Sequence, residues 1–249
     1  MTTDTLTIDV SQDWASACDV QQRFMEHPAA TIPTLNYSAS CRQIRALGGD
    51  CYHFLPLSGN RLALVVGDAS GKSLPAALLM SSVQSSLRTA TSFVGSDAAA
   101  VLSAVNSQVH ASSLADQYAT LFYGVFDGTT RTLRYANAGH NPPMVIRKDG
   151  TTIRLDTGGV PLGIFPSWDY TEGVVHLCPG DRVIAWTDGV TEAVNPAGEE
   201  WGVEGLLQAA EKCDAQCPDD VVRAIFASMD EFSFGRQMDD ATVMVAQVH

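Results

Sequence analysis

Strand-like and helical segments do not alternate along this sequence, and their order limits the folds that the chain can adopt. Helical patterns come two at a time, at residues 74–91 and 98–112 and again at 203–212 and 219–232. Strand-like segments come mostly in pairs joined by short turns, which predicts antiparallel hairpins. A regular βαβ order would favour a parallel sheet, whereas this grouping predicts an α+β fold with helices packed on antiparallel sheets.

The remaining patterns complete that arrangement. The expected hairpins join residues 51–57 to 61–66, 118–126 to 132–138, and 144–147 to 151–155. Single strands are expected at 35–42, 170–177, 182–186 and 241–248, and an N-terminal helix is expected at 11–26, before Pro28. With 249 residues, of which 45% are hydrophobic, the chain can fill one well-packed core.

Charge and composition argue against several classes of partner. The formal net charge is −13 and the 15 basic residues do not cluster, so the field of the chain should repel nucleic acid and anionic lipid. No apolar run reaches the roughly 18 residues of a membrane helix, and residues 1–13 lack the basic and apolar order of a signal peptide. The six cysteines show neither disulfide nor zinc-finger spacing. We expect a cytoplasmic protein that binds neither nucleic acid nor membrane.

Aspartates recur where a predicted strand ends in a glycine turn or begins after a loop. They stand in Gly48-Gly49-Asp50, Gly67-Asp68-Ala69-Ser70-Gly71, Thr187-Asp188-Gly189 and Asp239-Asp240. One such turn alone is typical of a capped, solvated aspartate. Four in order are more specific, because carboxylates and carbonyl oxygens are the ligands that Mg²⁺ and Mn²⁺ prefer. Converging carboxylates would repel one another without a cation, so the pattern predicts a metal site rather than an acid–base pair.

The stretch Gly71-Lys72-Ser73 is similar to the end of a phosphate-binding P-loop, but the sequence does not support ATP binding there. The P-loop motif requires a glycine five positions before Gly71, where Val66 stands. It would also place Asp68 inside a nest of amides that must accept an anion.

Taken together, these motifs resemble the SpoIIE/RsbU branch of the PPM protein phosphatases. The matching stretches are GGDCY at 48–52, GDASG at 67–71 with PAALLM at 75–80, AGHNPP at 138–143, TDGVTE at 187–192 and DDAT at 239–242. The resemblance runs from about Val20 to the C-terminus. It implies a phosphatase domain over 31–249, folded as a four-layer α-β-β-α sandwich with two central antiparallel sheets flanked by helix pairs, after a linker-like helix over 1–30.

The resemblance also implies a site for two Mn²⁺ or Mg²⁺ ions at one edge of the sandwich. The implied metal ligands are Asp50, Asp68, Ala69, Asp188, Asp239 and Asp240. Asp68 would bridge both ions and the Ala69 carbonyl would bind one of them. Asp188 and Asp239 would complete the shell of the other ion, and Asp50 would act through coordinated water. Asp240 would also orient its neighbour, Asp239.

The implied activity is hydrolysis of phosphoserine or phosphothreonine on a partner protein. Two ions about 4 Å apart would activate a shared water for in-line attack, without a protein nucleophile. The implied substrate is a phosphorylated STAS-type anti-anti-sigma factor in bacterial partner switching. One alternative is a catalytically weak module that sequesters a signalling partner, and another is a hydrolase of small phosphoesters.

Three single residues carry their own expectations. His53 stands where the family pattern has aspartate, and we expect a partly exposed strand histidine there. The alternatives are weakened metal binding, through loss of a negative charge, and catalytic protonation of the leaving oxygen. Ser73 replaces a frequent glycine and is expected to cap the following helix. His140 is expected to hydrogen-bond within its turn rather than to act in catalysis.

The N-terminal helix carries the last expectation. Residues 19–24 resemble the linker helix that joins a sensor domain to the phosphatase in this branch and takes part in regulation. About 25 residues are too few for a sensor, so the chain would act under a separate regulator or be a piece of a longer protein. An amphipathic helix with nothing to cover it could also pair with a second copy and form a homodimer.

Overall fold

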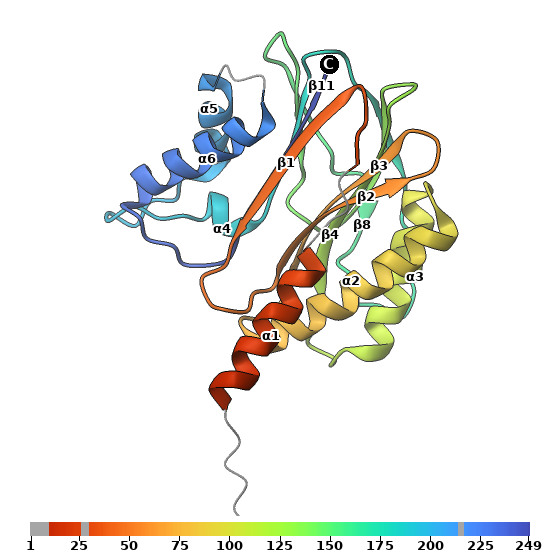
Figure 1. Ribbon diagram of the computed structural model, residues 1–249, viewed down its shortest axis with the longest axis vertical. Coiled ribbons are helices and arrows are strands. Elements are labelled where there is room, and N and C mark those ends of the chain that lie inside the picture. Colours follow the sequence, from red (N-terminus) through yellow and green to blue (C-terminus); the bar gives the residue numbers. More distant parts are fainter. Residues whose placement is uncertain (1–9, 26–29, 214–216) are drawn as a thin grey trace, which may run out of the picture.

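The computed structural model describes residues 10–25, 30–213 and 217–249, and these form four layers. Two sheets lie face to face, with helices α2 (Leu74–Val94) and α3 (Ala98–Ser112) against one of them. Helices α5 (Gly202–Lys212) and α6 (Pro218–Ser233) cover the other sheet, on the opposite side of the molecule (Figure 1). The α-β-β-α sandwich that the family resemblance implies is therefore confirmed.

The first sheet has the order β1-β11-β10-β6-β7 and all its pairings are antiparallel. Its strands are β1 (Leu35–Arg42), β6 (Met144–Ile146), β7 (Thr152–Arg154), β10 (Arg182–Trp186) and β11 (Ala241–Val248). The second sheet has the order β2-β3-β4-β5-β8, and β9 also pairs with β5. Its strands are β2 (Asp50–Leu57), β3 (Arg61–Ala69), β4 (Ala119–Asp127), β5 (Thr132–Ala138), β8 (Gly158–Gly159) and β9 (Gly173–His176). Only the two-residue pairing of β5 with β8 is parallel within the described residues.

Side-chain alternation along β3 explains the layering. Leu62, Leu64 and Val66 are buried between the two sheets, while Ala63 and Val65 are buried beneath α2 and α3. Successive side chains of a strand point to opposite faces, so a strand with apolar residues at every position is buried on both sides. A third apolar cluster fills the space between the first sheet and helices α5 and α6. Among the described residues, no helix combines the length and the apolar character needed to cross a bilayer.

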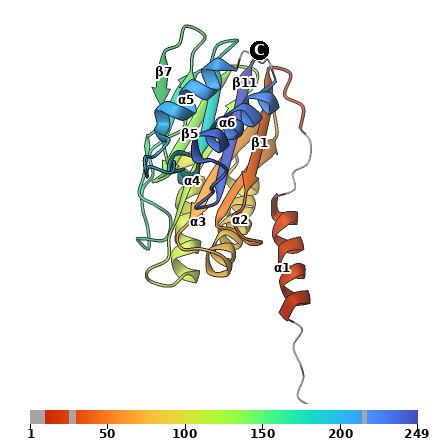
Figure 2. The same ribbon diagram turned by 90° about the vertical axis from the view of Figure 1, so that its left-hand side faces the viewer.

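The predicted elements agree well with the observed ones, with two differences near the aspartates. β3 continues to Ala69, three residues beyond the predicted end, because Gly67 and Asp68 still pair with β4. A four-residue helix, α4 (Asp188–Thr191), replaces the simple turn expected after β10. The N-terminal helix α1 (Val10–Met25) lies along one edge of the molecule, beside α2 and the start of β2 (Figure 2).

Candidate metal centre

Asp50 and Asp68 come from neighbouring strands of the second sheet. Asp50 is the first residue of β2, and its Cα partner on the antiparallel strand β3 is Asp68. Alternation places Asp50 on the same face of β2 as Phe54, and Asp68 on the same face of β3 as Val66, which is the face toward the first sheet. The strand register therefore brings these two carboxylates together at one edge of the sandwich.

The carboxylate of Asp50 joins the two sheets through hydroxyl groups. Asp50 Oδ2 accepts hydrogen bonds from Thr187 Oγ1 at 2.7 Å and from Thr242 Oγ1 at 2.6 Å. Thr187 follows β10 and Thr242 lies in β11, so both donors belong to the first sheet. Asp50 is only 2% exposed. These two bonds hold the side chain of Asp50 in place.

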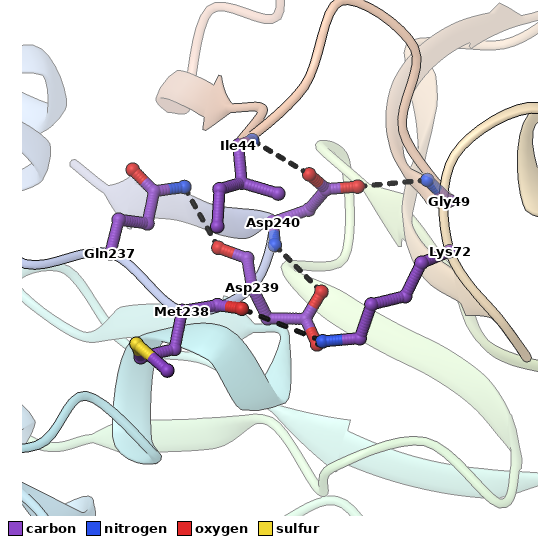
Figure 3. A network of polar contacts seen from close by, with 7 residues as sticks. All are labelled: Ile44, Gly49, Lys72, Gln237, Met238, Asp239 and Asp240. Carbon is purple, nitrogen blue, oxygen red and sulfur yellow. Dashed lines mark hydrogen bonds and ion pairs between the residues drawn. The ribbon is translucent and has the colours of Figure 1, made fainter.

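Asp188 and Asp239 reach the site from the first sheet. Asp188 opens α4 directly after Thr187, and Asp239 precedes β11. Asp239 Oδ1 accepts the backbone N–H of Asp240 at 2.9 Å, and Asp239 Oδ2 lies 2.5 Å from Lys72 Nζ (Figure 3). Mainly through this hydrogen bond, Asp239 raises the pKa of Lys72. One of the predicted metal ligands is thus paired with an ammonium group.

Asp240 has a different role from its neighbour. Its Oδ1 accepts the N–H of Ile44 at 2.8 Å, and its Oδ2 accepts the N–H of Gly49 at 2.9 Å (Figure 3). Asp240 is 7% exposed. Carboxylates that accept two backbone amides are held firmly, so Asp240 fixes the loop that leads into Asp50.

The aspartates share one electrostatic field. Burial is the largest cause that raises the pKa of Asp68, followed by the charges of Asp50, Asp188, Asp239 and Asp240. Burial likewise raises the pKa of Asp50, although its two threonine hydroxyls oppose that rise. For Asp188, burial and then the charge of Asp239 raise the pKa. Carboxylates that disfavour one another's ionisation in this way form an environment that a bound cation would stabilise.

Gly49 lies close to two of the predicted ligands. A Cβ atom at Gly49 would lie 3.0 Å from the carbonyl oxygen of Ala69 and 3.4 Å from Asp68 Oδ1. Glycine at this position therefore keeps both oxygens accessible. Carboxylate and carbonyl oxygens suit Mn²⁺ or Mg²⁺. The donor set fits the implied metal, and Asp68, Ala69, Asp188 and Asp239 are the residues that would hold it.

The side chains are nevertheless not arranged as a closed metal shell. Within the part of the chain that the structure describes, no three Asp, Glu, His or Cys side chains could hold a metal ion as they stand. One reason is that Asp239 is paired with Lys72 and that Asp50 accepts hydrogen bonds from two threonines. Metal binding would therefore require at least Asp239 to exchange its partner.

The expectation for His53 is wrong. Its side chain is fully buried, with 0% exposure, and its Cα pairs with Val65 inside the sheet. Alternation along β2 places His53 on the same face as Cys51, toward the helices, and opposite to Asp50. A buried ring on that face cannot contact a phosphoprotein, which argues against catalytic protonation by His53.

The capping expectation for Ser73 is also wrong. Ser73 adopts φ 63° and ψ −139°, and its hydroxyl makes no capping hydrogen bond. Side-chain capping needs an extended backbone at the N-cap, and Pro75 removes one of the N–H groups that could be capped. The first helical bond runs from Ala77 N to Ser73 O instead, at 2.9 Å.

The structural role predicted for His140 is confirmed. Asn137 Nδ2 donates to the carbonyl oxygen of His140 at 3.0 Å, and His140 N donates to Asn137 Oδ1 at 2.7 Å. The ring nitrogen His140 Nδ1 lies 2.9 Å from Thr120 Oγ1. The ring is 4% exposed, and burial lowers the pKa of His140 to about 4.

Sequence reasoning missed four residues that support the site: Gln21, Lys72, Thr187 and Thr242. Both threonines stand inside the aspartate motifs, as Thr187-Asp188-Gly189 and Asp239-Asp240-Ala241-Thr242, so their position was a usable signal. Lys72 belongs to a stretch similar to a P-loop, which does not indicate a role beside the aspartates. Nothing in the sequence indicates that the amide of Gln21 reaches the Gly48 backbone.

Solved structures of known proteins share this fold. The SiaA-PP2C domain of Pseudomonas aeruginosa superposes with a TM-score of 0.82 at 21% identity, over 96% of each chain. The catalytic domain of the serine/threonine protein phosphatase PstP, in complex with two manganese ions, gives a TM-score of 0.64 at 20% identity, over 86% of this chain and 98% of that one. The chain therefore has the fold of the PP2C-type phosphatase domains.

Sequence comparisons give the family within that class. The family model described as Stage II sporulation protein E (SpoIIE) matches residues 58–249, and the chain belongs to this family. Phosphoserine phosphatase RsbU of Bacillus subtilis is 28% identical over 240 residues, which cover 95% of this chain and 70% of RsbU. Protein IcfG of Synechocystis is 27% identical over 215 residues, covering 76% of this chain. The chain thus spans about a third of the length of IcfG, 34%.

Proposed function

We propose that this chain hydrolyses phosphoserine or phosphothreonine on a partner protein, with Mn²⁺ or Mg²⁺ at the acidic site. The observation that carries the proposal is the meeting of Asp50, Asp68, Asp188 and Asp239 at one edge of the sandwich, from both sheets. Burial, and after it mutual charge, raises the pKa of three of these acids: Asp50, Asp68 and Asp188. A site of this kind favours a divalent cation over a proton-transfer pair.

The residues of the site would have separate roles in binding the ions and in orienting water. Asp68, Asp188 and Asp239 would hold the ions with the carbonyl of Ala69. Asp50, fixed by its two threonine donors, would orient a water in the site. The bound ions would activate water for attack and neutralise the phosphoryl oxygens.

The partner that fits best is a phosphorylated STAS-type anti-anti-sigma factor in the cytoplasm, under an upstream regulator or sensor domain. The similarity to RsbU, a phosphoserine phosphatase, supports this choice. So does a solved structure of the RsbU and RsbW domains of Rv1364c from Mycobacterium tuberculosis, which matches at 27% identity with a TM-score of 0.73. The net charge of −13 offers no general attraction to a phosphoprotein, so recognition would depend on local contacts.

The test is hydrolysis of p-nitrophenyl phosphate and of a phosphoserine protein with Mn²⁺, with EDTA, and with the Asp188→Asn variant. We expect activity with Mn²⁺, none with EDTA, and a loss of roughly 100-fold or more in the variant, because metal contacts stabilise the transition state by several kcal/mol. Asp169→Asn, at an exposed aspartate outside the site, is the matched control. A folded, Mn²⁺-bound protein without turnover on either substrate would favour the module that sequesters a partner.

A further inference from the structure

Lys72 is placed at the acidic site by the loop between β3 and α2. Its Nζ atom lies 2.5 Å from Asp239 Oδ2 and 3.5 Å from the carbonyl oxygen of Met238 (Figure 3). Among the described residues, the ion pairs of the structure include no other cation on Asp50, Asp68, Asp188, Asp239 or Asp240. Lys72 therefore supplies the local positive charge for this group of carboxylates.

The position of the ammonium group conflicts with metal binding. Asp239 Oδ1 already accepts the N–H of Asp240, and Oδ2 is occupied by Lys72. A divalent ion bound by Asp239 would lie within a few ångströms of the ammonium group and would repel it. The two cations therefore compete for one carboxylate.

We propose that Lys72 is a tethered counter-ion that occupies Asp239 in the metal-free protein and must leave when Mn²⁺ or Mg²⁺ binds. Lys72 would be a positioning residue that lowers the apparent metal affinity of the site. The inference rests on the proposed metal dependence, but it concerns metal binding and not the identity of the substrate.

The surroundings of Lys72 permit this exchange. The side chain of Lys72 is 55% exposed and that of Asp239 is 40% exposed, so neither is locked by packing. Ion pairs of this exposure contribute little stability and are readily replaced. Gly71, the preceding residue, has φ 92°, and nothing lies within 4 Å of where its Cβ would be. The ammonium can therefore swing into solvent without displacing the core.

The decisive measurement is Mn²⁺ affinity of the full chain by isothermal titration calorimetry, without substrate. Lys72→Met removes the charge and keeps the length, and Lys72→Arg keeps the charge. Lys148→Met, at an exposed lysine in the β6–β7 turn, makes the same change in net charge far from the site. We expect the Kd of Lys72→Met to fall by about two- to fivefold, the range of an exposed ion pair, while Lys148→Met binds like the wild type and Lys72→Arg no more tightly than it.

A second readout uses the metal-free state. In EDTA, Lys72→Met should melt below the wild type, because Asp239 loses its counter-ion, and saturating Mn²⁺ should remove the difference. An unchanged or weaker Mn²⁺ affinity in Lys72→Met would overturn the proposal. A raised KM for a phosphoprotein with unchanged Mn²⁺ affinity would overturn it as well, and would assign Lys72 to the substrate phosphate. Absence of hydrolysis with the affinity shift present would instead contradict the proposed function alone.

Discussion

The side-chain amide of Gln21, on α1, holds the backbone of Gly48 from both directions. Gln21 Nε2 donates to the Gly48 carbonyl at 2.7 Å, and Gly48 N donates to Gln21 Oε1 at 3.2 Å. The next residue, Gly49, donates its N–H to Asp240. Two consecutive glycines therefore connect the N-terminal helix to the acidic site.

We predict that Gln21→Ala lowers Mn²⁺-dependent hydrolysis by about tenfold, the lower range for loss of a residue that orients metal ligands. The physical reason is that the buried N–H and C=O of Gly48 lose their partners, so the loop before Asp50 becomes less ordered. The control is Gln22→Ala, at an exposed position of the same helix. Steady-state hydrolysis at saturating Mn²⁺ measures the effect, and equal rates in the two variants would refute it.

The hydroxyl of Thr242 gives a prediction on stability. Thr242→Val removes the 2.6 Å hydrogen bond to Asp50 at a position with 0% exposure. We expect the free energy of unfolding in EDTA to fall by about 1–3 kcal/mol, the cost of leaving a buried acceptor short of a donor. Urea unfolding measures this. Thr242→Ser retains a hydroxyl and should lose less; a Val variant as stable as the wild type would show that the hydrogen bond does not contribute to stability.

The sequence predicted most of the fold because its local signals agree. Short turns between strand-like segments predicted the hairpins, and the observed bounds of β1, β5, β10 and β11 match the expected ones. The meeting of Asp50 with Asp68 follows from the same hairpin, since their positions on β2 and β3 make them register partners. Local patterns are sufficient where the register alone sets the geometry.

Contacts between distant segments could not be predicted in this way. The pair Lys72 and Asp239 is separated by 167 positions, and the bond from Gln21 to Gly48 joins a helix outside the motifs to a loop inside them. The burial of His53 depends on which face of the second sheet the helices cover, which a single strand does not reveal. The domain boundary near residue 30 and the homodimer through α1 remain predictions.

Backbone strain at Ser73 leads to a third prediction. A φ of 63° with ψ −139° is a conformation that glycine adopts more readily than serine. Ser73→Gly should therefore raise the free energy of unfolding by about 1 kcal/mol, at the low end of the cost of such strain. Ser73→Ala keeps the Cβ atom, and the lost hydroxyl caps nothing, so it should show no gain. Chemical unfolding of both variants decides, and a gain in the alanine variant would contradict the strain argument.

The buried ring of His140 leads to a prediction on pH. Burial lowers the pKa of His140 to about 4 from the ordinary value of 6.5, so the unfolded chain binds the proton more readily between these two values. The contribution of neutral His140 to the free energy of unfolding is complete above pH 6.5 and is lost as the pH falls toward 4. From pH 7 to 5 the loss amounts to about 2 kcal/mol, at 1.36 kcal/mol for each pH unit below 6.5.

Protonation of the carboxylates at the candidate metal centre changes the free energy of unfolding with pH in the opposite direction. The contribution of His140 must therefore be measured as a difference between two proteins. The His140→Gln variant lacks that term and keeps the carboxylates. The difference in free energy of unfolding between wild type and variant should therefore shrink by about 2 kcal/mol between pH 7 and pH 5. His176→Gln, at an exposed histidine, should leave the difference constant. If the His140 and His176 variants behave alike, protonation of the buried ring is not coupled to folding. A neutral imidazole at pH 5.5, observed by NMR in the folded wild type, would support the coupling independently of any variant.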